Sequence, residues 1–379
     1  MTYYLIAGEA SGDLHASNLI KALKRVDGQA SFRCWGGDLM AAAGANVVKH
    51  YRDLAFMGFW EVVKNIGAIR ANLQFCKEDI ITYRPDILIL VDYSGFNLRI
   101  AEWASKTGLR VFYYISPQIW ASRPKRVFKV KAFVNRMFVV LPFEKDFYKK
   151  YGVMVDYVGH PLLDVIKAYH FDKQFLEKYC IQKPIIALLP GSRKQEIKAL
   201  LPPMLSLIKL FPSYQFVIAA APSIPLSFYE GLIRKSKPND EKLMVIANHT
   251  YDLLKNAAAA IVTSGTATLE TALLGVPQVV CYKSNWFTYQ IAKRIITVRY
   301  ISLVNLIGNQ PIVEELIQND VSTKNLQIAL TKILEPLEAQ LIRKEYEKIK
   351  VLLGNEGASE RAAQLMLSYC KNKGDEYYF

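Results

Sequence analysis

The stretch YYLIAGEASGDLH, residues 3–15, leads from a short apolar run through a glycine-bearing turn into a helical pattern. Tyr3–Ala7 is apolar at odd and even positions alike, which favours a strand buried on both faces. Apolar residues then recur at helical spacing from Leu14 to Leu23. A buried strand that passes through a tight turn into a helix is typical of a doubly wound α/β sheet.

The same pattern recurs along the chain in two series. Each run is short and apolar, ends in turn residues, and is separated from the next by a segment with helical periodicity. The further runs are Ile87–Val91, Val111–Ile115, Met137–Leu141, Ile185–Leu189, Phe216–Ala220, Met244–Ala247, Ala260–Val262 and Gln278–Cys281. We therefore predict an α/β protein with two Rossmann-like doubly wound domains that face a cleft.

The break between the two series lies at residues 160–183, where a polar helical stretch is flanked by His160-Pro161 and Lys183-Pro184. We predict a first domain over residues 1–165 and a second over residues 166–345. The last strand-like run ends near Ile312, and the pattern beyond it is helical. Residues 346–379 are predicted to form a helical tail that can pack back on the first domain or exchange with a partner in a homodimer.

The composition indicates an anionic partner: 48 lysines and arginines against 34 acids leave a formal charge of +14. Nucleic acid, a phosphorylated substrate and an acidic membrane surface all fit this charge. The five cysteines are scattered without a C-x-x-C pair, and no Asp-x-Asp or other metal-ligand spacing occurs. We expect no disulfide framework, no metal and no cofactor. Because no apolar run approaches the roughly 18 residues that span a bilayer, any membrane contact is expected to be peripheral.

Ligands of doubly wound sheets bind beyond the carboxyl ends of the strands, so the residues after each run are the candidates. Glu9, Ser11 and His15 follow the first run, and Asp92 follows the second. An acid just past a buried strand lies where a general base is placed, with apolar surroundings to raise its pKa. The alternative is helix capping, by Ser11 or Asp13 in the first turn and by Asp92 in the second.

Two turns in the second half have the character of phosphate sites. Gly191, Ser192 and Arg193 open a helix, so main-chain N–H groups, the helix dipole and a guanidinium converge there. A second turn offers hydroxyls and amides at a helix start, with a carboxylate about one turn inside that suits a ribose diol. The alternatives are a solvated arginine and a plain capped helix. The residues of this second turn are Ser264, Gly265, Thr266, Thr268 and Glu270.

A basic stretch without acids extends from Trp103 to Phe143. Within it, Pro124 starts a predicted helix with valines on one side and basic residues on the other, which predicts contact with an anionic membrane surface. The alternative is a solvated basic face held down by its valines. A separate apolar cluster is either an acyl-chain or membrane contact or part of the core. The basic residues are Arg123, Lys125, Arg126 and Lys129, and the apolar cluster is Met57, Phe59 and Trp60.

Together these motifs resemble one family, lipid-A-disaccharide synthase, a glycosyltransferase of lipopolysaccharide assembly. The resemblance implies a B-type glycosyltransferase fold, with the UDP-sugar bound by the second half and the lipid acceptor by the first. The matching stretches are GEASGD (8–13), DYSGFN (92–97), SPQIWA (116–121), LPFEK (141–145), VGHP (158–161), LPGSR (189–193), GTATLE (265–270) and LVNLI (303–307).

The implied reaction joins UDP-2,3-diacylglucosamine to 2,3-diacylglucosamine 1-phosphate, with inversion and without a metal, to give a β-1,6 disaccharide and UDP. The resemblance implies Asp92 as the base, with Glu9 beside it and His15 as a rival. Family members can carry a second acid in an Asp-x-Pro-Asp-Phe loop, where this chain has Ser94-Gly95-Phe96. The implied enzyme is cytoplasmic and peripheral to the inner membrane. The donor residues are Gly191, Ser192, Arg193, Glu196, Ser264, Gly265, Thr266, Thr268, Glu270, Tyr282 and Asn305.

Two other functional classes compete with this interpretation. An isomerase of the UDP-N-acetylglucosamine 2-epimerase type shares the fold, but its substrate is water-soluble, which leaves the basic amphipathic stretch unexplained. A nucleic-acid-binding protein would explain the positive charge alone. Because the chain has no helix-turn-helix, zinc-finger or RNP signature, no nucleic-acid partner is expected.

Overall fold

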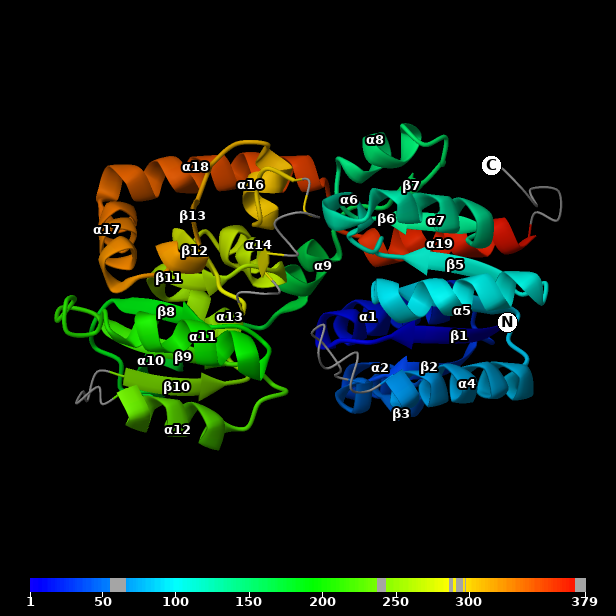
Figure 1. The fold of residues 1–379 in the computed structure, drawn as a ribbon, viewed down its shortest axis with the longest axis horizontal. Helices are drawn as coiled ribbons and strands as arrows, with labels where there is room; N and C mark the ends of the chain where they lie inside the picture. Colours follow the sequence, from blue (N-terminus) through cyan, green and yellow to red (C-terminus); the bar gives the residue numbers. More distant parts are fainter. Residues whose placement is uncertain (55–65, 237–242, 286–288, 291–295, 297, 372–379) are drawn as a thin grey trace. The chain divides into compact units, whose positions relative to one another are not determined.

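The computed structural model describes residues 1–54, 66–236, 243–285, 289–290, 296 and 298–371 (Figure 1). They belong to two compact units: the first is Met1–Lys167, Gln290–Val298 and Leu353–Phe379, and the second is Ala168–Tyr289 and Arg299–Leu352. The sequence placed the boundary at 165/166 and the start of the tail at 346. In the structure the segment that returns to the first unit begins at Leu353.

The first unit contains a seven-stranded parallel sheet in the order β3-β2-β1-β4-β5-β6-β7. Its strands are β1 Thr2–Ala7, β2 Ser31–Gly36, β3 Asn46–His50, β4 Ile87–Val91, β5 Arg110–Tyr114, β6 Arg136–Val139 and β7 Asp156–Tyr157. Its helices are α1 Ala10–Val26, α2 Asp38–Ala42, α4 Ile66–Tyr83, α5 Ser94–Lys106, α6 Ile119–Ser122, α7 Val127–Phe133, α8 Glu144–Lys149, α9 Pro161–Ala168 and α19 Ala358–Lys371. Short 3-10 turns lie at Tyr51–Leu54 and Pro124–Arg126.

The second unit contains a six-stranded parallel sheet in the order β10-β9-β8-β11-β12-β13. Its strands are β8 Ile185–Leu189, β9 Gln215–Ala220, β10 Leu243–Ala247, β11 Ala257–Thr263, β12 Gln278–Tyr282 and β13 Glu314–Ile317. Its helices are α10 Phe175–Lys178, α11 Lys194–Leu205, α12 Leu226–Ser236, α13 Thr250–Lys255, α14 Thr266–Leu273, α16 Leu303–Gly308, α17 Thr323–Leu334 and α18 Pro336–Leu353. A 3-10 turn lies at Gln318–Asp320.

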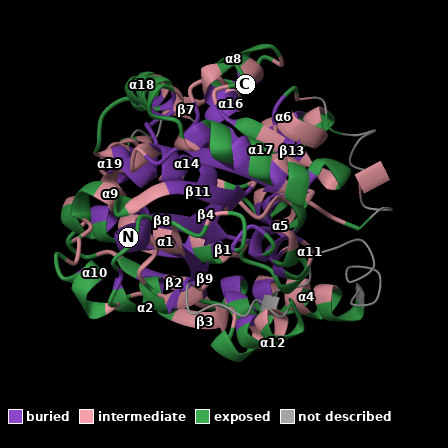
Figure 2. Cartoon of the chain, turned by 90° about the vertical axis from the view of Figure 1, so that its left-hand side faces the viewer, coloured by how far each residue is buried: buried purple, intermediate pink, exposed green. Residues whose placement is uncertain are grey.

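The two parallel sheets confirm the predicted fold class. The central strands β1, β4 and β8 are almost wholly buried, as expected for sheets covered on both faces (Figure 2). Strands β2, β3 and β7 were not predicted, and β13 lies in a region that the sequence assigned to helix. The outer strand β3 is only partly buried, and β13 begins with two glutamates, so neither has the apolar run that marks a central strand.

The C-terminal helix α19 packs on α1 within the first unit. Arg25 of α1 forms an ion pair with Glu360 of α19. Nearby, the Arg361 side chain donates to the carbonyls of Val158, Asn355 and Glu356. These contacts hold the returning segment against the first sheet.

Candidate active site

The strand order of each sheet reverses once. The four turns that the sequence marks as binding candidates, those after β1, β4, β8 and β11, lie in pairs at these reversals. In the first sheet the reversal falls between β1 and β4, where Ala7 is in register with Val91. In the second sheet it falls between β8 and β11, where Leu189 is in register with Val262. Ligands of open α/β sheets bind at such switch points, beyond the carboxyl ends of the strands. Each sheet therefore brings two of the predicted turns to its expected binding position.

The turn that carries Asp92 is held in an unusual backbone conformation. Asp92 and Tyr93 have φ of +44° and +48°, in the left-handed region that non-glycine residues seldom adopt. The buried Asn97 side chain donates to the carbonyls of Asp92 and Val91 over 2.9 and 3.1 Å. The Tyr113 hydroxyl also donates to the Asp92 carbonyl. Strain of about 1–3 kcal/mol per residue persists only where surrounding contacts enforce it, and it is typical of functional turns.

The cap of helix α5 is Tyr93, and it makes no side-chain capping bond. Asp92 lies one position earlier and is partly buried. The residue at the cap position of α5 is therefore Tyr93, and Asp92 lies at the carboxyl end of β4.

Gly8 and Tyr93 meet where the two turns of the first sheet come together. A Cβ on Gly8 would lie 2.4 Å from Cγ of Tyr93, so only glycine permits this contact. Burial raises the pKa of Tyr93, and the charge of Glu9 raises it further. Glu9 precedes α1 in extended backbone and makes no side-chain capping bond. The structure thus gathers Glu9 and the Asp92 turn at one position.

Asp13, in contrast, is structural. Its buried carboxylate accepts from the main-chain N–H groups of Gly37, Leu39 and Met40 over 2.8–3.1 Å. It therefore caps the following helix α2, not its own helix as the sequence suggested. Ser11 is half-buried in the first turn of α1.

His15 is buried and packs edge-on against His160, with 6.4 Å between ring centroids and 88° between ring planes. Burial lowers the pKa of His15 to about 4. Burial and then the charge of His15 lower the pKa of His160 to about 3. Both rings are neutral near pH 7. His15 is buried, whereas Glu9 and Asp92 are partly exposed, so the two carboxylates are more accessible to a substrate than His15.

Glu144 is a buried carboxyl group that the sequence did not single out as a site residue. Its two oxygens accept from Trp120 Nε1 at 3.1 Å and from the main-chain N–H groups of Val140 and Leu141 at 3.1 and 2.9 Å. Burial raises its pKa to about 7 despite these bonds. Glu144 links the loop after β5 to the loop after β6. Because its side-chain partner Trp120 lies 24 residues away, only the position of Glu144 in LPFEK marked it in the sequence.

In the second unit, the turn before α11 is built around Glu196. The carboxylate of Glu196 accepts from the Ser192 main-chain N–H at 3.2 Å and from Arg193 Nη1 at 3.1 Å. Gly191 has φ of +121°, and a Cβ there would lie 2.6 Å from Glu196 Oε2. Glu196 thus fixes the turn and holds the partly exposed Arg193 guanidinium at the carboxyl end of β8.

The neighbouring turn after β11 leaves the start of α14 open. Gly265 precedes the helix with φ of +150°, and a Cβ there would meet no atom within 4 Å. The Ser264 hydroxyl donates to the carbonyl of Ile301 at 2.8 Å, which fixes the turn. Thr266 is the first helical residue and is partly exposed. Main-chain N–H groups of this helix end are available to an anion.

Two of the predicted donor residues are buried and hydrogen-bond to neighbouring loops of the protein. Thr268 is fully buried and donates to the Gly265 carbonyl at 2.8 Å. Asn305 is buried, donates to the Val313 carbonyl and Glu315, and accepts from the Val313 main-chain N–H, all at 2.8–2.9 Å. These hydrogen bonds hold the turn at Gly265 and the segment at Val313 in place.

The remaining donor candidates lie near the same sheet edge. Glu270 is half-buried, accepts from the Tyr251 hydroxyl at 2.7 Å, and has its pKa raised by burial. Tyr282 is the last residue of β12 and is half-buried. The sheet order places this strand end directly beside β11.

The basic stretch contains the helix α7, whose valines pack into the core. Val127, Val130 and Val134 are buried in the core of the first unit. Lys129 forms an ion pair with Glu102 of α5 at 3.0 Å. The valines therefore hold this stretch against the core, while Arg123 and Lys125 are exposed. Met57, Phe59 and Trp60 lie outside the described residues.

Among the described helices, none is long and apolar enough to cross a membrane. The same part of the chain holds no group of three or more His, Cys, Asp and Glu side chains that could bind a metal ion.

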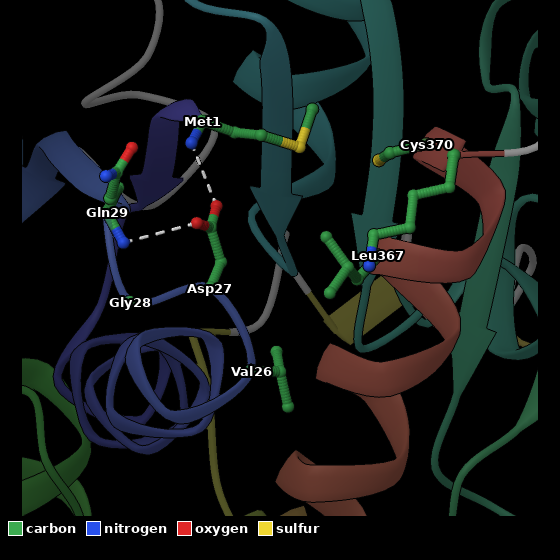
Figure 3. Close-up of a pocket in the computed structure, with 8 residues that line it drawn as sticks. Met1, Val26, Asp27, Gly28, Gln29, Leu367 and Cys370 are labelled. Atoms are coloured by element: carbon green, nitrogen blue, oxygen red, sulfur yellow. Dashed lines mark hydrogen bonds and ion pairs between the residues drawn. The ribbon is translucent and has the colours of Figure 1, made fainter.

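A pocket of about 420 Å³ opens at the other end of the first sheet, where β1 begins (Figure 3). Asp27 lies on its wall and accepts from the Met1 amino group at 2.9 Å and from the Gln29 main-chain N–H at 3.4 Å. Because it lies at the amino ends of the strands, this pocket is not the binding position of a doubly wound fold.

The chain matches the family model described as lipid-A-disaccharide synthetase over residues 3–369. It is 38% identical to the lipid-A-disaccharide synthase of Syntrophus aciditrophicus, over 97% of each chain. Among solved structures, it resembles S. aureus MnaA, solved with UDP, with a TM-score of 0.70, 13% identity and coverage of 97% and 96%.

A second similar structure is the UDP-GlcNAc 2-epimerase of Methanocaldococcus jannaschii, solved with UDP-GlcNAc and UDP. Its TM-score is 0.67 at 15% identity, with coverage of 97% of this chain and 100% of the other. At such low identity these two structures show a shared fold alone. The family match and the full-length relative confirm the resemblance found in the sequence, so the chain belongs to the lipid-A-disaccharide synthetase family of glycosyltransferases.

Proposed function

We propose that the protein transfers 2,3-diacylglucosamine from its UDP conjugate to 2,3-diacylglucosamine 1-phosphate, forming the β-1,6 disaccharide 1-phosphate and UDP. Family membership supports lipid A disaccharide formation. The observation that carries the mechanism is the Asp92 turn, which holds a carboxylate at the switch point of the first sheet in a strained, well-braced conformation.

In the proposed step, Asp92 accepts the proton of the acceptor hydroxyl while that oxygen attacks the anomeric carbon of the donor. The bond from the anomeric carbon to the UDP oxygen breaks, and UDP leaves with the electron pair. A single displacement of this kind inverts the anomeric carbon. Glu9 lies beside the same turn and is the second candidate for the proton acceptor.

The second unit is proposed to bind UDP. The Arg193 guanidinium and the open N-terminal end of α14 would balance the charge of the diphosphate, so that no metal ion is needed. Glu270 would accept from a ribose hydroxyl. Gly191 permits the close approach of Glu196 that shapes the turn before α11, since any side chain there would collide with Glu196.

The acylated substrates place the enzyme at a membrane surface, and we propose peripheral association with the cytoplasmic face of the inner membrane. The exposed cations Arg123 and Lys125 support contact with anionic headgroups. Replacing both with serine is expected to weaken partition onto anionic vesicles while leaving the affinity for UDP unchanged.

The proposal is tested by supplying the purified protein with UDP-2,3-diacylglucosamine and 2,3-diacylglucosamine 1-phosphate, and following UDP and lipid products by mass spectrometry. UDP release that requires both substrates supports the transferase. If no disaccharide forms, and UDP-N-acetylglucosamine is instead converted to its 2-epimer, the proposal is wrong and the isomerase alternative is correct.

A further inference from the structure

The basic residues around the start of α5 fall into two groups. Lys106 and Lys129 both contact Glu102, at 3.2 and 3.0 Å, so this carboxylate balances their charge. Arg126 instead directs Nη1 to the Ser94 hydroxyl at 3.2 Å. In the part of the chain that the structure describes, no carboxylate lies within ion-pair distance of Arg99, Arg123 or Arg126.

Arg126 is half-buried and held in place, unlike a flexible surface cation. Burial lowers its pKa, and the positive charges of Arg123 and Arg99 lower it further, so three guanidinium groups share one region. Concentrated positive charge that is partly withdrawn from water attracts an anion. Guanidinium groups suit a phosphate best because they donate in pairs to its oxygens.

The position of this group links it to the proposed reaction. Ser94, the hydroxyl partner of Arg126, is only two residues beyond Asp92, hence within roughly 7 Å along the chain. Ser94 also begins the 13-residue helix α5, and Gly95 beside it is exposed, with no atom within 4 Å of an added Cβ. An anion here would meet the open end of a helix as well as the guanidinium groups.

We propose that Arg126, together with Arg99 and Arg123, binds the phosphomonoester of the glycosyl acceptor. This inference rests on the proposed function. In a glucosamine 1-phosphate, the carbons that bear the phosphate and the CH₂OH group flank the ring oxygen. A phosphate held against Arg126 therefore keeps the attacking hydroxyl near Asp92, and the arginines select an acceptor that carries the phosphate.

The test compares the acceptor 2,3-diacylglucosamine 1-phosphate with 2,3-diacylglucosamine that lacks the phosphate. Wild type, Arg126→Gln and Lys129→Gln are assayed with both acceptors at saturating donor. Lys129→Gln is the matched control, because it removes a cation of the same stretch that Glu102 already balances. Arg126→Lys retains the charge but removes the paired donors. Thermal unfolding of each variant confirms that it is folded.

The inference predicts that Arg126→Gln lowers kcat/KM for the phosphorylated acceptor by about 10- to 100-fold and changes kcat/KM for the phosphate-free acceptor little. Lys129→Gln should keep the wild-type preference, and Arg126→Lys should fall between. An equal loss with both acceptors would overturn the inference and assign Arg126 a role in holding the Ser94 turn.

A lipid-headgroup role gives a different result. If Arg126→Gln keeps the wild-type acceptor preference but loses partition onto vesicles of anionic phospholipid, Arg126 binds the membrane and the inference is wrong. If wild type forms no disaccharide with either acceptor, the proposed function fails. Direct titration of wild type and Arg126→Gln with the phosphorylated acceptor then still decides whether Arg126 binds it, and equal affinity would overturn the inference.

Discussion

The Asn97 side-chain amide donates to the main-chain carbonyl of Asp92 over 2.9 Å, so a fully buried residue holds the turn that carries the proposed base. The same amide reaches the Val91 carbonyl at 3.1 Å. The Asn97 side chain thereby links helix α5 to the end of β4 and to the turn that follows it. The position of Asp92 depends on this brace because its own backbone conformation is unfavourable.

Replacing Asn97 with alanine is expected to lower kcat by about 100-fold, since a small displacement of a reacting group is costly. KM for the donor should change little, because the donor is proposed to bind the second unit. Steady-state kinetics measure both. Asn256→Ala is the control, since Asn256 also donates to an aspartate carbonyl, that of Asp252, but away from the site. An unchanged kcat in Asn97→Ala would contradict the bracing role.

Gly191→Ala is expected to weaken UDP binding by at least about tenfold, measured by calorimetric titration. The added methyl group would lie 2.6 Å from Glu196 Oε2 at a φ of +121°, so the phosphate turn must shift. Gly231→Ala is the matched control: that glycine lies in α12, and a Cβ there meets no atom within 4 Å. The control should stabilise the fold slightly, by about 0.5–1 kcal/mol, and bind UDP normally.

The buried pair His15 and His160 predicts a loss of stability in acid. Their pKa values, about 4 and about 3, are below the 6.5 of an exposed histidine, so the unfolded chain binds protons that the native chain does not. Their contribution is complete above pH 6.5 and falls as the pH is lowered toward 4, by on the order of 3 kcal/mol for each residue.

Urea unfolding between pH 4 and pH 8 measures this effect. The slope of the unfolding free energy against pH reports the number of protons taken up on unfolding. In His15→Leu this number should be smaller by nearly one near pH 5. An unchanged slope would show that His15 is protonated in the native state, contrary to its burial.

Glu144→Ala is expected to lower the unfolding free energy by about 3 kcal/mol, because three buried N–H donors lose their acceptor.

Burial raises the pKa of Glu144 to about 7, so the native carboxyl holds its proton more firmly than the unfolded one. Its titration therefore favours the native state below pH 4.5, and this contribution is lost as the pH rises toward 7. Between pH 4.5 and 7, the unfolding free energy measured in urea should therefore change with pH differently in wild type and in Glu144→Ala. Parallel curves of unfolding free energy against pH would contradict the raised pKa of Glu144.

Much of the fold could be predicted because the central strands are apolar on both faces. Ile87–Val91 and Ile185–Leu189 match β4 and β8. Strand β13 could not be found in this way, because Glu315 faces Ser302 and Asn305 and interrupts the apolar pattern. An edge strand such as β13 is recognised by its pairing with the neighbouring strand β12, and a single sequence does not show that pairing.

The candidate site was predictable at the level of turns and less so at the level of side chains. The positions after β1, β4, β8 and β11 follow from the fold class. Whether a side chain there binds a ligand or braces a loop depends on partners distant in sequence. Asn305 bonds to Val313 and Glu315, and Asp13 caps α2, and neither role follows from local spacing.

The role of Asp92 as the base is tested by the amount of disaccharide 1-phosphate that wild type and Asp92→Asn form in the presence of EDTA, measured by mass spectrometry. We expect product and UDP in equal amounts from wild type. We expect at least about 100-fold less product from Asp92→Asn, with an unchanged affinity for UDP. Full activity of Asp92→Asn, or wild-type activity that EDTA abolishes, would contradict the proposed metal-independent transfer with Asp92 as the base.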